Sequence, residues 1–286
     1  MLSKILIAYD GSDCSDAALK DLRRAGLPTL VQATVVTVAY TFLPNDELLE
    51  NECVSPAAAH MVQPAQAEAR QAIETALAVA EQGAHRVKAE FPDWSVSAKA
   101  TAGSPGWAIL DMADSFGVDL IVLGSHDHSS AGGRLILGSV SQRVLYEASC
   151  SVRVARCLDQ RRSGPVRIIL GFFNSQDAEA AVDAVAARTW PKGSEARVIT
   201  AHPAWESERQ LMASERLGAA GLSVTDVFSK GEPAKVLINE AERWPADSIF
   251  IGTRDVHGFQ HLLHGSVSSA VAARAHCSVE VVRIKN

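Results

Sequence analysis

The feature that most constrains the fold is an ordered pattern of apolar runs and glycine-rich turns that occurs twice along the chain. The matching segments, first half before second, are 5–8 with 168–171, 103–105 with 231–233, 138–141 with 265–268, and 150–152 with 277–279. A pattern that returns in the same order over half the sequence indicates a tandem duplication. We therefore expect two domains, 1–158 and 165–286, with a linker at 159–164.

Within each half, short β-branched runs alternate with helical patterns. The strands expected in the first half are 4–9, 33–39, 94–101, 119–123 and 151–155, and a long helix is expected over 65–90, after breaks at Pro56 and Pro64. Ser12 or Ser15 is expected to cap the first helix. Alternation of this kind predicts an α/β fold in which helices cover both faces of a doubly wound parallel sheet. The duplication then predicts two five-stranded sheets in tandem.

The fourth strand of each half runs into a phosphate-site pattern. In the first half a buried run ends at Gly124, a small polar loop follows, and Gly138-Ser139-Val140-Ser141 begins a helix. A strand, a loop that permits close backbone approach and a helix N-terminus together form an anion site. The carboxyl ends of strands one and four are expected to share one crevice, which would bring Asp10 to this site.

Composition excludes several classes of function. A net charge of −6 and a pI of about 5.9 give no electrostatic basis for binding nucleic acid or an anionic membrane. No segment reaches the roughly 20 apolar residues that span a bilayer, and the short N-terminal apolar run reads as a first strand rather than a signal peptide. The five cysteines include no CxxC pair, which favours reduced thiols. We expect a cytoplasmic protein.

Taken together, the repeated motifs resemble the universal stress protein family in its tandem form. The resemblance covers nearly the whole chain and rests on Asp10–Ser12, Gly103–Pro105, Gly124, Gly138–Ser141 and Cys150–Val152 with their second-half counterparts. It implies a Rossmann-like fold, similar to that of the adenine-nucleotide alpha hydrolases, with strand order 3-2-1-4-5. It also implies ATP binding, which many members achieve through a glycine-rich motif and others have lost.

Transferred to matching positions, the resemblance makes four first-half residues phosphate candidates: Gly124, Gly138, Ser139 and Ser141. Asp10 becomes the candidate for the ribose or adenine end, and Ala39 and Tyr40 mark the adenine-facing end of the second strand. The second-half phosphate candidates, which form a weaker set, are Gly252, Gly265, Ser266 and Ser268.

Three departures from the family pattern weaken the nucleotide interpretation. Asp127 and Asp255 stand where the pattern has its second glycine, and Phe173 stands where the second half would need the equivalent of Asp10. A carboxylate about 4 Å from a phosphate opposes it by roughly 4 kcal/mol at an effective dielectric constant near 20. A bridging Mg²⁺ would reverse that sign, so Asp127 stays in the candidate set and Asp255 in the weaker one.

Simpler interpretations stay open beside the nucleotide site. Serines at a helix start are common N-caps, and Asp10 is equally suited to cap the helix that follows it. His126 and His128 in one loop, and His257, His261 and His264 in the other, are candidate metal ligands, although solvated loop histidines explain them as well. No metal site is predicted.

The expected function is a non-enzymatic stress-response module. The first domain would bind ATP, with or without Mg²⁺, as a regulatory signal, because neither a Walker A motif nor a serine nucleophile elbow is present. The alternatives are a relative that acts through assembly or an apolar ligand, and a weak metal-dependent ATP hydrolase. The strands at 151–155 and 278–284 are expected to pair within the chain as an intramolecular pseudo-dimer, and a homodimer stays open.

Overall fold

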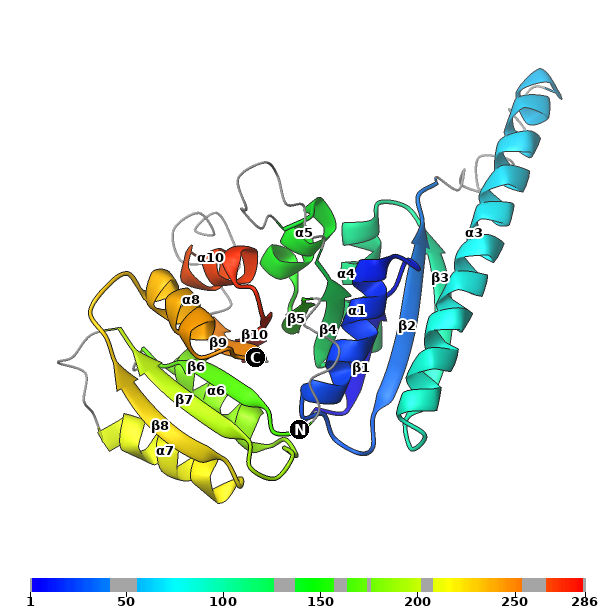
Figure 1. Ribbon diagram of the computed structural model, residues 1–286. Helices are drawn as coiled ribbons and strands as arrows, with labels where there is room; N and C mark the ends of the chain where they lie inside the picture. The colour runs from blue at the N-terminus through cyan, green and yellow to red at the C-terminus, as the bar shows by residue number, and fades with distance from the viewer. Residues whose placement is uncertain are drawn as a thin grey trace.

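The computed structural model describes residues 2–41, 56–125, 137–156, 164–173, 176–201, 208–253 and 266–284, with the side chains of 56–63 and 266 excepted. Strands and helices alternate through both halves (Figure 1). The first half contains β1 (Lys4–Ala8), α1 (Asp13–Asp21), η1 (Leu22–Arg24), β2 (Gln32–Ala39), α3 (Pro56–Glu90), β3 (Ser95–Ala102), α4 (Pro105–Phe116), β4 (Leu120–Gly124), α5 (Ser139–Glu147) and β5 (Ser151–Ala155).

The second half repeats this order with shorter helices. Its elements are β6 (Arg167–Gly171), α6 (Gln176–Ala186), β7 (Glu195–Thr200), α7 (Glu208–Ala219), β8 (Ser223–Phe228), α8 (Pro233–Arg243), β9 (Ser248–Thr253), α10 (Ser266–Arg274) and β10 (Ser278–Arg283). Equivalent threonines make the same contact in both halves: Thr37 and Thr200 each donate a hydrogen bond to the carbonyl just beyond the first strand, at Tyr9 and Phe172. The α/β fold expected from the alternation is confirmed.

The strands form one sheet of ten, in the order β3-β2-β1-β4-β5-β10-β9-β6-β7-β8. Within each half all pairings are parallel, and β5 and β10 pair antiparallel at the centre, with Arg153 opposite Glu280. The two expected five-stranded sheets are therefore continuous with each other. This junction buries the last strand of each half, which would otherwise be an exposed edge.

Helices cover both faces of the sheet and create three apolar cores among the residues that the structure describes. One core extends across both halves, under α4, α5, α8 and α10. On the opposite face α1 and α3 cover the first half, and α6 and α7 cover the second. Because the shared core crosses the junction, the two halves are packed together by apolar burial as well as by strand pairing.

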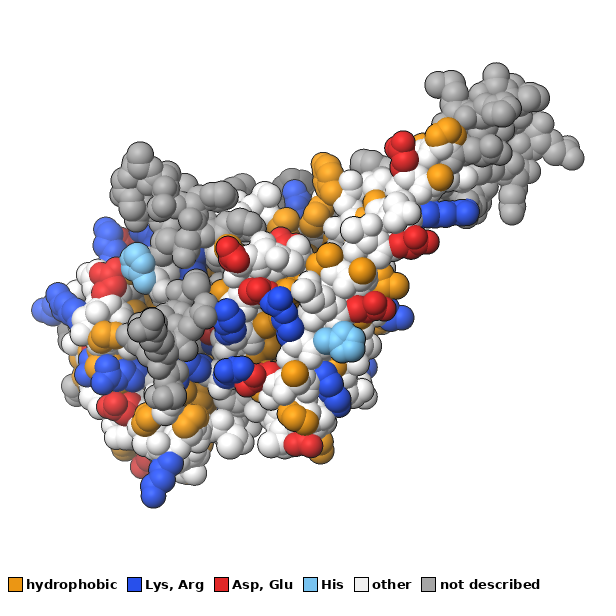
Figure 2. Space-filling view, turned by 45° about the vertical axis from the view of Figure 1, so that its right-hand side comes forward, with side chains coloured by type: hydrophobic (Ala, Val, Ile, Leu, Met, Phe, Trp, Pro, Cys, Tyr) orange, Lys and Arg blue, Asp and Glu red, His pale blue; other side chains and the backbone are white. Residues whose placement is uncertain are grey.

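Helix α3 differs from its prediction. It begins at Pro56 rather than near residue 65, and Pro64, expected to break the chain, lies inside it. The sequence on both sides of Pro64 is rich in alanine and glutamine, which favour helix strongly enough to continue through a proline. Figures 1 and 2 show that the N-terminal part of this helix projects beyond the body of the protein.

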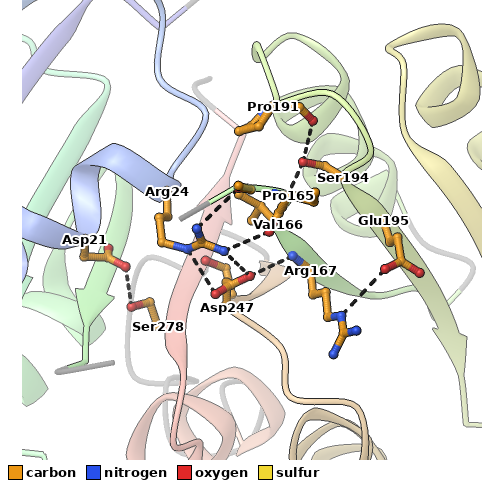
Figure 3. A network of polar contacts seen from close by, with 12 residues as sticks. Asp21, Arg24, Pro165, Val166, Arg167, Pro191, Ser194, Glu195, Asp247 and Ser278 are labelled. Carbon is orange, nitrogen blue, oxygen red and sulfur yellow. Dashed lines mark hydrogen bonds and ion pairs between the residues drawn. The ribbon is translucent and has the colours of Figure 1, made fainter. Parts of the chain in front are cut away.

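Polar contacts also cross between the halves on the α1 side of the sheet (Figure 3). The guanidinium of Arg24 donates two hydrogen bonds to the carboxylate of Asp247, at 3.1 and 2.8 Å, and a third to the carbonyl of Pro165 at 3.0 Å. Beside this group, the hydroxyl of Ser278 donates to Asp21 at 2.7 Å. These charge-assisted contacts add directional constraints to the apolar junction.

Candidate functional site

A cavity of about 460 Å³ lies beyond the carboxyl ends of β1, β2 and β4, between α1 and α5. Its volume is within the range of small-molecule sites. Its lining includes polar groups from Asp10, Ser12, Ser15, Gly138, Ser139 and Ser141. It also includes the aliphatic side chains of Ala8, Val36, Val38, Ile109, Leu123 and Val140. A ligand that combines polar groups with an apolar surface matches this lining.

Asp10 organises the turn between β1 and α1. Its Oδ1 accepts hydrogen bonds from the backbone N–H of Ser12 at 3.0 Å and from the Ser12 hydroxyl at 2.6 Å. The Ser12 side chain in turn accepts from the backbone N–H of Ser15 at 3.2 Å and is the N-cap of α1. The helix cap is therefore Ser12, one of the two predicted residues, and Asp10 orients that cap while lining the cavity.

The first turn of α5 faces the same cavity with its backbone N–H groups lacking a side-chain cap. Gly138 occupies the N-cap position with φ −63° and ψ 157° and makes no side-chain capping bond. Ser139 and Ser141 lie inside the helix, so neither is its N-cap. Helix N-termini carry a partial positive charge and unsatisfied N–H donors, which favour an anion.

Gly124 joins β4 to both helices of the site. The hydroxyl of Ser141 donates to the Gly124 carbonyl at 3.1 Å, which fixes α5 against the strand end. A Cβ at Gly124 would lie 2.3 Å from the carbonyl oxygen of Cys14, in the first turn of α1. Gly124 is thus required for the close approach of α1, a packing reason for glycine that the phosphate pattern did not reveal.

Two predicted adenine-side residues lie away from the cavity. Ala39 is buried but is not part of the lining, and Tyr40 is 82% exposed. Val36 and Val38 of β2 line the cavity in their place. Successive residues of a strand point to opposite faces, so Ala39 faces away from Val36 and Val38, and Tyr40 lies beyond the end of β2.

Several predicted residues lie outside the described residues. These are Asp127, Asp255 and Gly265, together with the histidines His126, His128, His257, His261 and His264. Among the residues that the structure describes, no group of three or more His, Cys, Asp or Glu side chains is arranged to hold a metal ion. In the same part of the chain, no helix has the length and apolar character needed to cross a membrane.

In the second half an apolar side chain stands at the position that Asp10 occupies in the first half. Gly252 is the second-last residue of β9, Ser266 begins α10, and Ser268 is buried within that helix. Over the end of β6, however, Leu237 and Phe173 lie 3.1 and 3.3 Å from the position of a Cβ on Gly171. Phe173 is the residue that replaces the Asp10 equivalent, so a ring packs against the core where a carboxylate would meet a ligand.

Tyr9 is a cavity residue that the sequence analysis did not single out. Its buried hydroxyl donates to Asp16 at 2.7 Å, and Asp16 also pairs with Arg86 of α3. Gly83 of α3 permits this packing, since a Cβ there would lie 2.7 Å from the Tyr9 ring. The long helix is therefore held against the turn that carries Asp10. Tyr9 ends an apolar run, so only its tertiary partners distinguish it from an ordinary core residue.

Burial, followed by the hydrogen bond and charge of Asp16, raises the pKa of Tyr9 to about 12. The unfolded chain ionises this phenol near pH 10, so its contribution to stability is complete below pH 10 and disappears as pH rises through 12. We expect an absorbance titration of the three tyrosines to contain a step near pH 12 that Tyr9→Phe removes. A step that persists in the variant would contradict this assignment.

The comparisons with known proteins agree with this architecture. A family model described as "Universal stress protein family" matches residues 1–156 and again residues 166–283. The chain belongs to the universal stress protein family. A universal stress protein of Mycolicibacterium smegmatis is 28% identical over 300 residues, which cover 98% of this chain and 96% of the relative. A universal stress protein of Mycobacterium tuberculosis is 30% identical over 185 residues, which cover 57% of this chain and 61% of the relative.

A solved universal stress protein from Archaeoglobus fulgidus has the same fold across both halves. The superposition gives a TM-score of 0.67 and covers 99% of this chain and 98% of the other, at 19% identity. At that identity the likeness concerns the fold alone. It places the repeated α/β arrangement of this universal stress protein in a known tandem architecture.

Proposed function

We propose that this universal stress protein binds an adenine nucleotide, ATP with Mg²⁺, in the cavity of its first half, and that binding serves as a regulatory signal. The observation that carries the proposal is the meeting of Asp10, Gly124 and the N-terminus of α5 in one cavity of about 460 Å³. The lining offers a helix N-terminus, a carboxylate and aliphatic side chains, and each of these suits a different part of a nucleotide.

The first turn of α5 would receive the phosphates through the N–H groups that follow Gly138. Asp10 lines the cavity with one oxygen holding Ser12, and its carboxylate would accept a ribose hydroxyl. Val36, Val38 and Ile109 supply an apolar wall on which an adenine ring would pack. The site that the sequence predicted at the strand ends is thus supported, with β2 contributing a different face.

Charge balance favours Mg²⁺ in the proposed complex. The described residues that line the cavity include no lysine, arginine or histidine. The partial charge of one helix N-terminus is about half an elementary charge, well below that of a triphosphate. Mg²⁺, when bound, would neutralise part of the phosphate charge. Asp10 is the only acidic side chain in the described lining, so this part of the cavity holds no pair of carboxylates to repel the phosphates.

A regulatory role follows from linkage. A ligand that binds one conformation more tightly stabilises that conformation, and the altered surface is available to other proteins. A cytoplasmic setting, where millimolar ATP would be available, belongs to the same proposal. In the second half Phe173 stands where Asp10 stands in the first, so the carboxylate proposed to meet the ribose has no counterpart there.

Titration calorimetry with Mg-ATP tests the proposal. We expect saturable binding by the wild-type chain and its loss in Gly138→Val, because a branched side chain at the N-cap blocks the approach to the N–H groups. Asp10→Ala should weaken binding roughly tenfold, the equivalent of one hydrogen bond to a charged group. Asp183→Ala, at a 62% exposed side chain on α6, is the matched control and should bind normally. A folded wild-type chain that shows no response to millimolar Mg-ATP would disprove nucleotide binding.

The apolar wall also favours a second candidate, an apolar ligand that supports assembly. Six aliphatic residues line the cavity, enough to hold such a molecule without phosphate contacts. Native mass spectrometry of gently purified protein distinguishes the two, because co-purified nucleotide supports the first and a lipid-like mass supports the second. Release of phosphate from Mg-ATP would instead indicate a weak hydrolase.

A further inference from the structure

Two arginines at equivalent positions each reach from one half of the protein to the other. Arg156 follows β5, and Arg283 ends β10. The backbone N–H of Arg156 donates to the hydroxyl of Ser278, and that of Arg283 donates to the hydroxyl of Ser151, both at 3.1 Å. The reciprocal contacts show that the two arginines occupy matching places on either side of the antiparallel junction.

The side chain of Arg283 contacts the C-terminal end of α5. Its guanidinium donates to the carbonyl of Leu145 in the last turn and to the carbonyl of Cys150 at 3.1 Å. Helix α5 has no basic residue in its own last turn. A cation at this end satisfies carbonyls that lack helical partners and complements the helix dipole. The second half therefore supplies the charge that the end of α5 lacks.

Arg156 makes the reciprocal contact with the second half. Its buried guanidinium donates to the carbonyls of Ala272 and Ala273 in the last turn of α10, at 2.7 and 3.2 Å. It also donates to the hydroxyl of Ser125, the residue directly after Gly124. Each half thus contributes an arginine that holds the end of a helix in the other half. Arg156 also contacts the end of β4 beside the cavity, through Ser125.

We infer that Arg283 is a positioning residue for the ligand site of the first half. The helix that it holds is only nine residues long, and the opposite end of that helix supplies Gly138, Ser139 and Ser141 to the cavity. Fixing the last turn of a short, rigid helix fixes the direction of the N–H groups in its first turn. The inference rests on the proposed nucleotide site, and it gives the second half a role as a brace for that site.

Affinity for Mg-ATP tests this role, measured well below the melting temperature of each variant. Arg283→Met should bind about tenfold more weakly, within the usual range of coupling between distant sites. Arg283→Lys keeps the charge but not the forked donors, and should recover part of the affinity. The control is Arg167→Met, which removes a half-exposed arginine paired with Glu195 in the second half and should bind as the wild type does.

Amide hydrogen exchange of the free protein provides a second readout that requires no ligand. In Arg283→Met, residues 139–147 should exchange about tenfold faster while α1 keeps its protection. If the wild-type chain binds no nucleotide, the proposed function is wrong, and exchange in α5 alone decides the positioning role. Unchanged exchange in α5, or a wild-type affinity in Arg283→Met, would overturn the inference.

Discussion

Gly252→Ala is expected to destabilise the protein by about 3 kcal/mol or more, as overpacking against a rigid partner does. A Cβ at this position would lie 1.7 Å from the carbonyl oxygen of Asp177 and 2.2 Å from its carbonyl carbon. Both atoms belong to the backbone of α6, so no side-chain rotation relieves the clash. Gly124→Ala meets the equivalent carbonyl of Cys14 at 2.3 Å and should also destabilise, to a smaller extent.

The matched control is Gly218→Ala in α7. A Cβ there has nothing within 4 Å, and alanine favours a helix over glycine by roughly 0.5–1 kcal/mol. Urea denaturation monitored by circular dichroism should therefore give a lower free energy of unfolding for Gly252→Ala and a slightly higher one for Gly218→Ala. A Gly252→Ala free energy of unfolding within about 0.5 kcal/mol of wild type would contradict the packing role.

Glu280→Gln is expected to cost about 3 kcal/mol, because it leaves buried arginines without part of their counter-charge. Glu280 is 1% exposed and pairs with Arg188 and with Arg153. Arg153 is fully buried and also forms an ion pair with Asp21. Burial alone would lower the pKa of Arg153, but the two carboxylates outweigh that effect and raise it. The four side chains thus alternate in charge across the junction of the halves.

An exposed pair gives the control for this variant. Glu195 and Arg167 are separated by 3.6 Å, with side chains 45% and 43% exposed, so Glu195→Gln should change stability by no more than about 0.5 kcal/mol. Thermal and urea denaturation of both variants measure the difference. Equal free energies of unfolding for Glu280→Gln and Glu195→Gln would show that the buried arginines do not need the charge of Glu280 for stability.

The same network explains why the two halves pair with each other. Arg153 and Glu280 stand at equivalent positions of β5 and β10 and face each other in the antiparallel register. Two copies of β5 in this register would place arginine against arginine, and two copies of β10 glutamate against glutamate. Opposite charges at the centre therefore favour the arrangement within one chain.

Much of the architecture was readable from local patterns. Apolar period and turn residues predicted the alternation of strands and helices, and the returning order of glycine motifs predicted the duplication. These motifs predict Asp10, Gly124, Gly138, Ser139 and Ser141 as site residues, and all five line the cavity. These features depend on residues close in sequence, or on the rule that parallel strands end at one edge of a sheet.

Long-range contacts decided the rest. The face of β2 that meets the cavity depends on the helix that covers each side, so Val36 and Val38 replaced Ala39. Helix α3 continues through Pro64 because the residues on both sides of the proline favour helix, and their sum outweighs the cost of one proline.

The repeat, the α/β alternation and the glycines near the ends of β4 and β9 are expressed in short patterns, so they are predictable without the structure. The three-dimensional fold shows why those glycines are required, through the backbones of α1 and α6 that lie against them. It also decided that Arg283 supports α5, a contact between residues 138 positions apart. Such a contact depends on the geometry of the whole sheet, which no local pattern records.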